Sequence, residues 1–274
     1  MALKDRFRLR VGCTFTYRLA GSVPALVQVA ARRGESVDVL RETWELDPAA
    51  SLDELSDPYG NTIHRTTLGP GTSHVRYDAT VGVPGQPDEV RPGAHQHAIE
   101  ALPAEALHHL LASRYCESDA LAPTALDLFG DGPAGWPLGQ AICDWVHENV
   151  RFREGSSDLT TSARDVFARR EGVCRDFAHL FIAFCRAMNI PARYVFGYLP
   201  DLFVDPSSSP MDFCAWAEVY LDGRWWTFDP RNNQRRVGRV VVGRGRDAVD
   251  VAMVTTWGAA ELTGFEVWAE ESAG

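Results

Sequence analysis

The sequence lacks the long apolar run that a membrane-spanning helix requires. None of its 274 residues belongs to a stretch that approaches the roughly 18 consecutive apolar residues of a transmembrane segment. Residues 1–15 also lack the apolar core of a secretory signal peptide. We therefore expect no membrane insertion and a cytoplasmic location.

Positive charge is scarce relative to negative charge. The chain has 27 lysines and arginines against 37 aspartates and glutamates, which gives a formal net charge of −10. Binding to nucleic acid or to an anionic membrane surface needs a basic face. The charge balance therefore argues against both kinds of partner, while it leaves the substrate undefined.

The cysteines form no CxxC pair and show no repeated spacing; they are Cys13, Cys116, Cys143, Cys174, Cys185 and Cys214. Disulfide frameworks and structural zinc sites have regular spacings, so this pattern is typical of free thiols in a reducing compartment. The histidine pairs His95/His97 and His108/His109 have no Cys, Asp or Glu at ligand spacing. We expect neither a metal nor a cofactor.

Alternating apolar and polar residues dominate the first 90 residues. Such alternation is typical of half-buried strands, and turn signals such as Asp57–Asn61 separate the runs. Strands are predicted at residues 7–17, 26–31, 37–46, 62–68 and 73–83. Residues 1–90 are therefore expected to form an antiparallel β sandwich.

The turn-rich segment Pro84–Gly93 marks the predicted domain boundary, and the apolar period becomes helical after it. Helices are expected at 99–111, 137–151, 163–169 and from Cys174 to near Asn189. Strands are expected at 193–198, 215–221, 224–229, 239–242, 251–255 and 264–269. The fold class is therefore α+β, with residues 91–274 as a core of helices packed on an antiparallel sheet.

Cys174 is the first candidate for chemistry. The turn Glu171–Gly172 runs directly into an apolar helical run, so Cys174 lies in or near the first turn of a helix. Unpaired amides and the helix dipole at that end stabilise a thiolate, which is the reactive form. A buried, inert cysteine is the ordinary alternative, and position alone does not decide between the two.

A cysteine nucleophile needs a base, and a third group usually orients that base. Cys214 opens the first strand of a predicted hairpin and Asp229 closes the second, and the Asp222–Gly223 turn signal lies between them at nearly equal distance from each. This spacing predicts that Cys214 and Asp229 are cross-strand neighbours.

Several segments resemble the bacterial transglutaminase-like superfamily; they are Ser157–Ala163, Gly172–His179, Asn189–Arg193, Gly197–Tyr198, Ala215–Tyr220 and Phe228–Asn233. The N-terminal module resembles the β domain that precedes the core in many members. The resemblance implies a papain-like core with a Cys-His-Asp triad, in which Cys174 is the nucleophile and Asp229 the acid. The position of the histidine is occupied by Cys214.

Other residues near these positions have expected roles. Trp216, Asp212 and Tyr198 are assigned to substrate binding, and Glu218 is a candidate partner for an arginine such as Arg193. His179 lies five residues after Cys174, roughly 140° around the helix at about 100° per residue, so it should point away from the thiol and have a structural role.

A cysteine in the base position leaves several functions open. As an enzyme, the chain would act on a peptide, amide or thioester acyl group, with Cys174 forming a thioester and helix amides binding the oxyanion. A thiol is a poorer acid than imidazolium, so a thioester substrate suits the pair better than an amide. Nothing in the sequence defines whether the enzyme hydrolyses or transfers the acyl group, or its oligomeric state.

The alternatives use the same residues differently. A thiol and a thiolate on opposite faces of a carbon could serve a cofactor-independent epimerase, racemase or cyclase. Cys174 and Cys214 could also form a disulfide that acts as a redox lock. A Cys/Cys/Asp metal site is disfavoured because no fourth ligand is visible. The final alternative is a catalytically inactive binding module.

Overall fold

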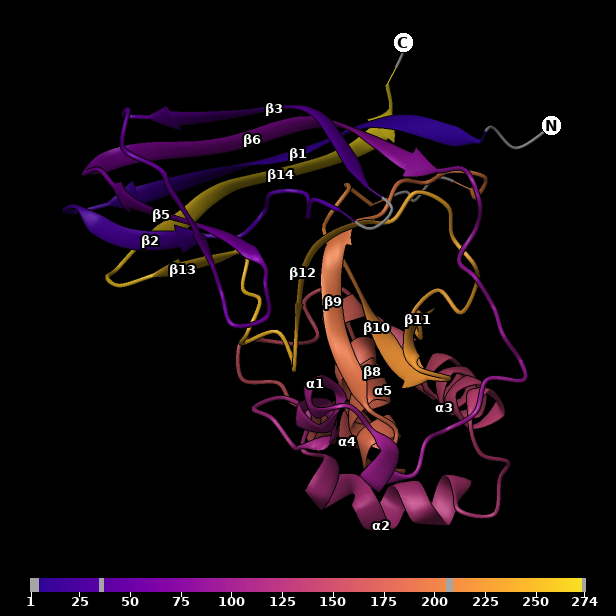
Figure 1. Ribbon diagram of the computed structural model, residues 1–274. Coiled ribbons are helices and arrows are strands. Elements are labelled where there is room, and N and C mark those ends of the chain that lie inside the picture. Colours follow the sequence, from indigo (N-terminus) through magenta and orange to yellow (C-terminus); the bar gives the residue numbers. More distant parts are fainter. Residues whose placement is uncertain (1–4, 35–36, 206–208, 273–274) are drawn as a thin grey trace.

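The structure is a computed structural model that describes residues 5–34, 37–205 and 209–272. Long strands from both ends of the chain form one part, and the helices gather around a separate sheet in the other (Figure 1). This mixed α+β architecture is the predicted fold class.

The N-terminal part contains two antiparallel four-stranded sheets. The first has the order β14 (Glu261–Glu271), β1 (Arg6–Leu19), β6 (Gly71–Pro84) and β3 (Asp38–Asp47). The second has the order β13 (Val254–Thr256), β2 (Val23–Val27), β5 (Thr62–Leu68) and β4 (Asp53–Ser56). Alternate residues of β1, from Phe7 to Tyr17, are buried in the core, as the sequence pattern predicts.

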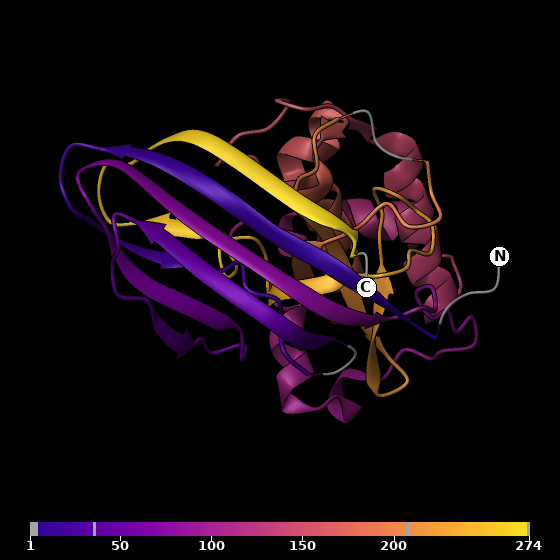
Figure 2. The ribbon, with the colours of Figure 1, turned by 90° about the horizontal axis from the view of Figure 1, so that it is seen from above.

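The last strands return to the N-terminal part. β14 pairs with β1, with Phe265 opposite Phe15, and β13 pairs with β2, with Thr255 opposite Leu26. Figure 2 shows β14 running beside β1 along the length of the sheet. The expectation that residues 91–274 form the core by themselves is therefore corrected, because strand periodicity does not reveal which sheet a strand joins.

The second part is built on a four-stranded antiparallel sheet with the order β11 (Arg224–Phe228), β10 (Cys214–Leu221), β9 (Ala192–Tyr198) and β12 (Val240–Gly245). Its helices are α1 (Ala104–Leu107), α2 (Ser118–Phe129), α3 (Trp136–Asn149), α4 (Ala163–Arg169) and α5 (Cys174–Ala187). Short 3₁₀ turns lie at η1 (Ile99–Ala101) and η2 (His108–Leu110), so the single helix predicted over 99–111 is broken. The short strands β7 (Arg151–Phe152) and β8 (Glu171–Gly172) pair in parallel.

α5 is the central helix of this part. It packs against β9 and β10 and also contacts α2, α3 and α4. All residues from Asp176 to Arg186 are buried, because helices and sheet surround them. The helix ends where Asn189 takes a positive φ of 60° and Pro191 follows, as the sequence predicts. This burial fixes the position of Cys174 at the first residue of the helix.

The two parts are joined by hydrogen bonds between buried groups. The hydroxyl of Tyr198 donates to the carbonyl of Val29 at 2.8 Å. Asn61 binds the backbone of Arg244 twice, with Nδ2 donating to its carbonyl and Oδ1 accepting from its amide. In the described part of the chain, no helix is long and apolar enough to cross a membrane.

Candidate active site

Cys174 is the first residue of α5 and is partly exposed to solvent. Val173 precedes it in an extended conformation, and the carboxylate of Asp176 accepts a hydrogen bond from the Val173 amide at 2.8 Å. The amides of the first helical turn lack partners inside the helix and carry the positive end of its dipole. The predicted place of Cys174 at a helix N-terminus is confirmed.

Gly172 allows the chain to approach this turn closely. A Cβ atom at this position would lie 2.6 Å from the Cβ of Asp176, which is far closer than packed carbon atoms come. Asp176 itself is fully buried. The Gly172-Val-Cys segment is therefore shaped by close packing of the backbone against the cap of α5.

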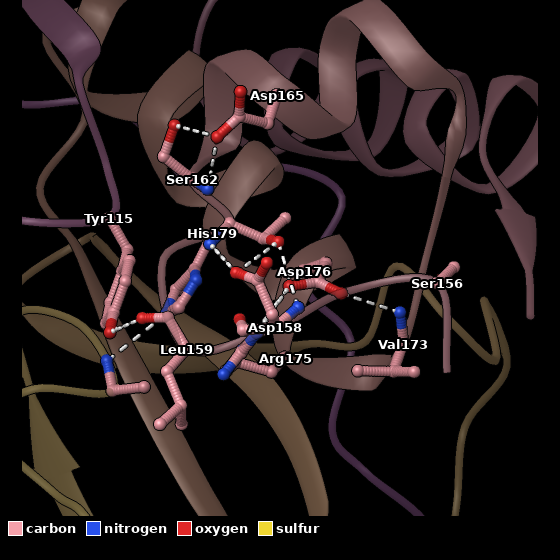
Figure 3. A network of polar contacts seen from close by, with 12 residues as sticks. Tyr115, Ser156, Asp158, Leu159, Ser162, Asp165, Val173, Arg175, Asp176 and His179 are labelled. Atoms are coloured by element: carbon pink, nitrogen blue, oxygen red, sulfur yellow. Dashed lines mark hydrogen bonds and ion pairs between the residues drawn. The ribbon is translucent and has the colours of Figure 1, made fainter. Parts of the chain in front are cut away.

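The loop before α4 is bound to the same helix end (Figure 3). Oδ1 of Asp158 accepts hydrogen bonds from the amides of Thr160 and Thr161 at 2.7 and 3.1 Å, and the pKa of Asp158 is lowered to about 2 by its bonds with Thr160 and Thr161. The guanidinium of Arg175 donates to the carbonyl of Asp158 at 2.7 Å. The Ser157–Ala163 segment thus supports the residue that follows the nucleophile.

Cys214 begins β10 and is 7% exposed. The sulfur of Cys174 lies 3.8 Å from the carbonyl oxygen of Phe213, the residue before Cys214, and it also interacts with the amide of Ala215, the residue after it. Cys174 packs against the apolar cluster that contains Cys214. The structure therefore brings together the two cysteines that the sequence assigns to one site.

The two thiols have opposite acidities. Hydrogen bonding from Cys214 lowers the pKa of Cys174 against the effect of burial, with smaller contributions from the Ala215 amide and the charge of Arg231. Hydrogen bonding to Cys174 raises the pKa of Cys214 well above its ordinary value, and burial and the charge of Asp229 act in the same direction. Of the two thiols, Cys174 is therefore the one that loses its proton more readily.

Asp229 follows β11 and is buried, but it is not directly opposite Cys214. The register pairs Ala217 with Phe228, so its continuation sets Trp216 beside Asp229. The predicted cross-strand pairing is therefore wrong by two residues, although the charge of Asp229 does act on Cys214.

Asp229 is held by other groups. Burial alone would raise its pKa, but the guanidinium of Arg239 and the amides of Asn232 hold the pKa below its ordinary value. Nη2 of Arg239 donates to Oδ2 of Asp229 at 2.8 Å, and Nδ2 of Asn232 donates to the same oxygen at 2.8 Å. Arg239 was missed from the sequence because it lies ten residues after Asp229 and carries no motif of its own.

The three residues assigned to substrate binding have different surroundings. Tyr198 is fully buried between the two parts of the chain, where it binds Val29, so its assignment to substrate binding is wrong. Trp216 is 1% exposed, and the guanidinium of Arg239 lies 4.8 Å from the centre of its ring. Asp212 is exposed, and its charge raises the pKa of Cys174, which places it near the thiol.

Glu218 lies on the same face of β10 as Trp216 and is buried. Nε of Arg193 donates to its carboxylate at 2.7 Å, which confirms the predicted pair, and Nε of Arg244 donates at 2.9 Å. A cavity of about 340 Å³ adjoins these residues, and Trp216 and Arg239 also line it. Cys214, Trp216 and Glu218 share one face of β10, and the last two of them line a charged cavity.

A second, more open hollow of about 610 Å³ lies over the loop that follows Asp229. Phe203, Arg231, Asn232 and Arg236 are among its lining residues. Arg231 also lowers the pKa of Cys174 through its charge. Arg231 belongs to the Phe228–Asn233 segment, but no feature of the sequence singles it out.

The contacts of His179 are with residues other than Cys174. His179 is fully buried, its ring stacks on Tyr115 at 5.1 Å, and its Nε2 accepts a hydrogen bond from the amide of Ala248 at 3.2 Å. Burial holds its pKa well below the ordinary value, so it is neutral. Its predicted structural role is confirmed (Figure 3).

His147 lies near the other end of the site. Its Nδ1 is 3.2 and 3.0 Å from the carbonyl oxygens of Pro230 and Arg231, which identifies it as a donor to the loop after Asp229.

Within the described residues, no three side chains of His, Cys, Asp or Glu are grouped so that they could hold a metal ion.

Comparisons with known proteins agree with this architecture. Residues 137–230, which include Cys174, Cys214 and Asp229, match the transglutaminase-like superfamily. A crystal structure of a candidate cysteine protease from Cytophaga hutchinsonii is 33% identical and superposes with a TM-score of 0.88 over 99% of this chain and 92% of that chain. The chain belongs to the transglutaminase-like superfamily.

Curated relatives match over a shorter part. An uncharacterized protein of Mycobacterium leprae is 35% identical over 116 residues, which is 41% of this chain and 41% of that protein. An uncharacterized protein of Mycobacterium tuberculosis is 40% identical over 130 residues, which is 42% of this chain and 40% of that protein. The chain thus spans about two fifths of the length of the curated relatives that it matches.

Proposed function

We propose that the chain is a cysteine-nucleophile enzyme that transfers or hydrolyses acyl groups, with Cys174 as the nucleophile and Cys214 in the place of the usual base. The observation that carries this proposal is the contact between a partly exposed Cys174 at the start of α5 and a buried Cys214 thiol. A lowered pKa increases the thiolate fraction of Cys174, and so reduces its need for a base that removes the proton.

The first step follows from this arrangement. The Cys174 thiolate attacks the carbonyl carbon of the substrate, and the oxygen becomes an anion. Backbone amides at the start of α5, at the positive end of its dipole, are the donors that stabilise it. The tetrahedral intermediate then expels its leaving group and leaves an acyl thioester on Cys174.

The identity of the leaving group decides which substrate suits the site. Cys214 holds its proton firmly because its pKa is raised, so it is a weak donor to a departing amine. A thiolate leaves without protonation, since an ordinary thiol has a pKa of about 8.5. Thioesters and activated esters are therefore favoured over peptides and amides.

The two-cysteine epimerase or racemase is a weaker candidate. In that mechanism the substrate carbon lies between the two sulfurs, with one base on each face. Here Cys174 and Cys214 interact directly, so the sulfurs would have to separate to admit a carbon atom. Incubation in deuterated water is the test, because an epimerase incorporates deuterium at the carbon that it inverts.

The acyl-transfer proposal is tested by trapping the intermediate. The protein is mixed with an aryl thioester at pH 7, quenched in acid and digested, and the acylated cysteine is located by mass spectrometry. We expect one acyl group on Cys174 and none on the buried Cys143 or Cys185. The variant Cys174→Ser should lose this rapid acylation.

Two results would overturn the proposal. Acylation spread over several cysteines, or absent from Cys174, would remove its role as a nucleophile. Alkylation by iodoacetamide provides a second measurement that needs no substrate: Cys174 should react faster than Cys143 and Cys185, and equal rates would instead favour a binding module.

A further inference from the structure

The sulfur of Cys174 lies against the backbone on both sides of Cys214. It is 3.8 Å from the carbonyl oxygen of Phe213, and it interacts with the amide of Ala215. The side chain of Cys214 lies between these two peptide groups and belongs to the apolar cluster against which Cys174 packs. Both residues are free thiols. The two sulfurs are therefore neighbours that interact by a hydrogen bond.

The two cysteines differ in their access to solvent. Cys174 is partly exposed, whereas Cys214 is only 7% exposed. A small reagent in solution therefore meets Cys174 first, and Cys214 can react only with what forms on Cys174. This is the arrangement of an attacking thiol and a resolving thiol.

We propose that Cys174 and Cys214 form a reversible redox pair that is oxidised by hydroperoxides. The proposal does not depend on acyl transfer, because it requires only the two sulfurs. It adds a second reaction to the site, in which formation of a disulfide removes the nucleophile and so switches off the acyl chemistry.

The reaction has two steps. The Cys174 thiolate attacks one oxygen of the hydroperoxide, so that an S–O bond forms as the O–O bond breaks. The alkoxide that leaves takes a proton from water and becomes an alcohol, or water when the oxidant is hydrogen peroxide. Cys174 is thereby oxidised to a sulfenic acid, and the peroxide is reduced.

Cys214 resolves this intermediate. Oxidation of Cys174 removes the thiolate partner that contributes most to the raised pKa of Cys214. Cys214 then gives up its proton and its sulfur attacks the sulfenic sulfur, so that the S–S bond forms as the S–O bond breaks. The proton from Cys214 combines with the departing hydroxide to give water. A small dithiol reverses the process by thiol–disulfide exchange, which restores both thiols and oxidises the dithiol to its own disulfide.

The remaining cysteines serve as internal controls. Cys13, Cys116, Cys143 and Cys185 are buried, and burial raises the pKa of each thiol. Thiols of this kind react slowly with peroxide because the thiolate is the reactive form. Oxidation should therefore be confined to the Cys174–Cys214 pair.

The test is titration of the native chain with hydrogen peroxide, followed by alkylation of free thiols and digestion without reductant. We expect a linked peptide that joins Cys174 to Cys214, and a fall from six free thiols to four. Dithiothreitol should restore all six. Hydrogen peroxide that converts Cys174 to the sulfinic acid without any link, or that leaves Cys174 unchanged, would overturn the proposal.

A variant separates the two steps. In Cys214→Ser the sulfenic acid on Cys174 should persist and react with dimedone, and no linked peptide should form. Circular dichroism tests whether this variant is folded, and the linked peptide of the native chain tests the proposal even if the variant does not fold. Failure of the redox pair together with normal acylation of Cys174 would leave the proposed function intact.

Discussion

Arg239 and Asp229 form an ion pair inside the protein, with 2.8 Å between Nη2 and Oδ2 and side chains that are 7% and 3% exposed. Nε of the same arginine binds the carboxylate of Asp88 at 2.9 Å. Asp229, the acid of the predicted triad, is therefore paired with the guanidinium of Arg239. With Cys214 in place of a histidine, Asp229 supplies a fixed charge beside a thiol instead of orienting a base.

The variant Arg239→Gln should lose stability. It leaves the buried Asp229 and the partly buried Asp88 without this cation, and breaking a buried ion pair costs about 3–5 kcal/mol. Urea unfolding at pH 7, followed by tryptophan fluorescence, measures the difference. The matched control is Arg235→Gln, which removes the same charge from an exposed arginine that donates to the Asp88 backbone.

The stabilisation by the Arg239–Asp229 pair should also depend on pH. The pKa of Asp229 is depressed in the folded chain, so the pair stabilises the protein above the ordinary carboxyl pKa of about 3.9. This contribution is lost as the pH falls through the depressed folded value. The penalty of Arg239→Gln should therefore stay constant down to about pH 4 and shrink only below it, and a penalty that persists at lower pH would contradict the buried pairing.

The hydrogen bond between the two cysteines should be visible in the pH profile of alkylation. Cys174 in the native chain should titrate below the ordinary cysteine pKa of about 8.5. The variant Cys214→Ala removes the donor, so the inflection should move to higher pH. If the pKa of Cys174 rises by about one, the thiolate fraction well below that pKa falls about tenfold, and the alkylation rate falls with it. Iodoacetamide rates between pH 5 and 10 measure the change.

Cys214→Ser is the control for this experiment. Serine keeps a hydroxyl donor of similar size, so its profile should lie closer to that of the native chain than the profile of Cys214→Ala does. If both variants leave the inflection unchanged, the lowered pKa of Cys174 comes from the helix and its amides alone.

Local signals in the sequence predicted the main elements of the site. The turn before Cys174, the apolar run after it and the stop at Pro191 together define α5 almost to the residue. The Asp222–Gly223 turn similarly placed the hairpin of β10 and β11. Each of these features depends on residues that are close in sequence, where propensity and turn chemistry act directly.

The predictions that the structure corrects share one physical cause, which is contact between segments that are distant in sequence. Tyr198 lies in a motif segment, yet a contact with Val29 buries it. The partner of Asp229 is Arg239, and β14 pairs with β1 at the other end of the chain. None of these contacts has a local pattern. α2 was also missed, because Pro123 lies inside it and weakens the helical signal.

Glu218→Gln should destabilise the sheet that carries the site. The carboxylate of Glu218 is buried and accepts from Arg193 and Arg244, so neutralising it removes the negative charge from a buried cluster. We expect a loss of about 3 kcal/mol or more in the free energy of unfolding. The control Glu261→Gln changes an exposed pair with Arg18 and should cost about 0–1 kcal/mol. Equal effects would contradict the prediction.

Removal of residues 261–274 should destabilise the sheet that contains β1, although these residues lie far in sequence from the other strands of that sheet. β14 covers the edge of β1 from Leu9 to Arg18, so its loss exposes unpaired backbone groups that favour aggregation. It also removes the buried Val267, and burial of one such side chain is worth about 1.5–3 kcal/mol. Thermal unfolding and light scattering measure both effects.

A chain that ends at Glu271 is the control, since it keeps β14 whole. Hydrogen exchange then locates the damage. In the longer truncation, amides of β1 that bond β14 should exchange rapidly, while those that bond β6 on the other edge should stay protected until the sheet unfolds. Unchanged protection along β1 would mean that β14 contributes little, and residues 1–90 would then behave as the separate N-terminal domain that the sequence predicts.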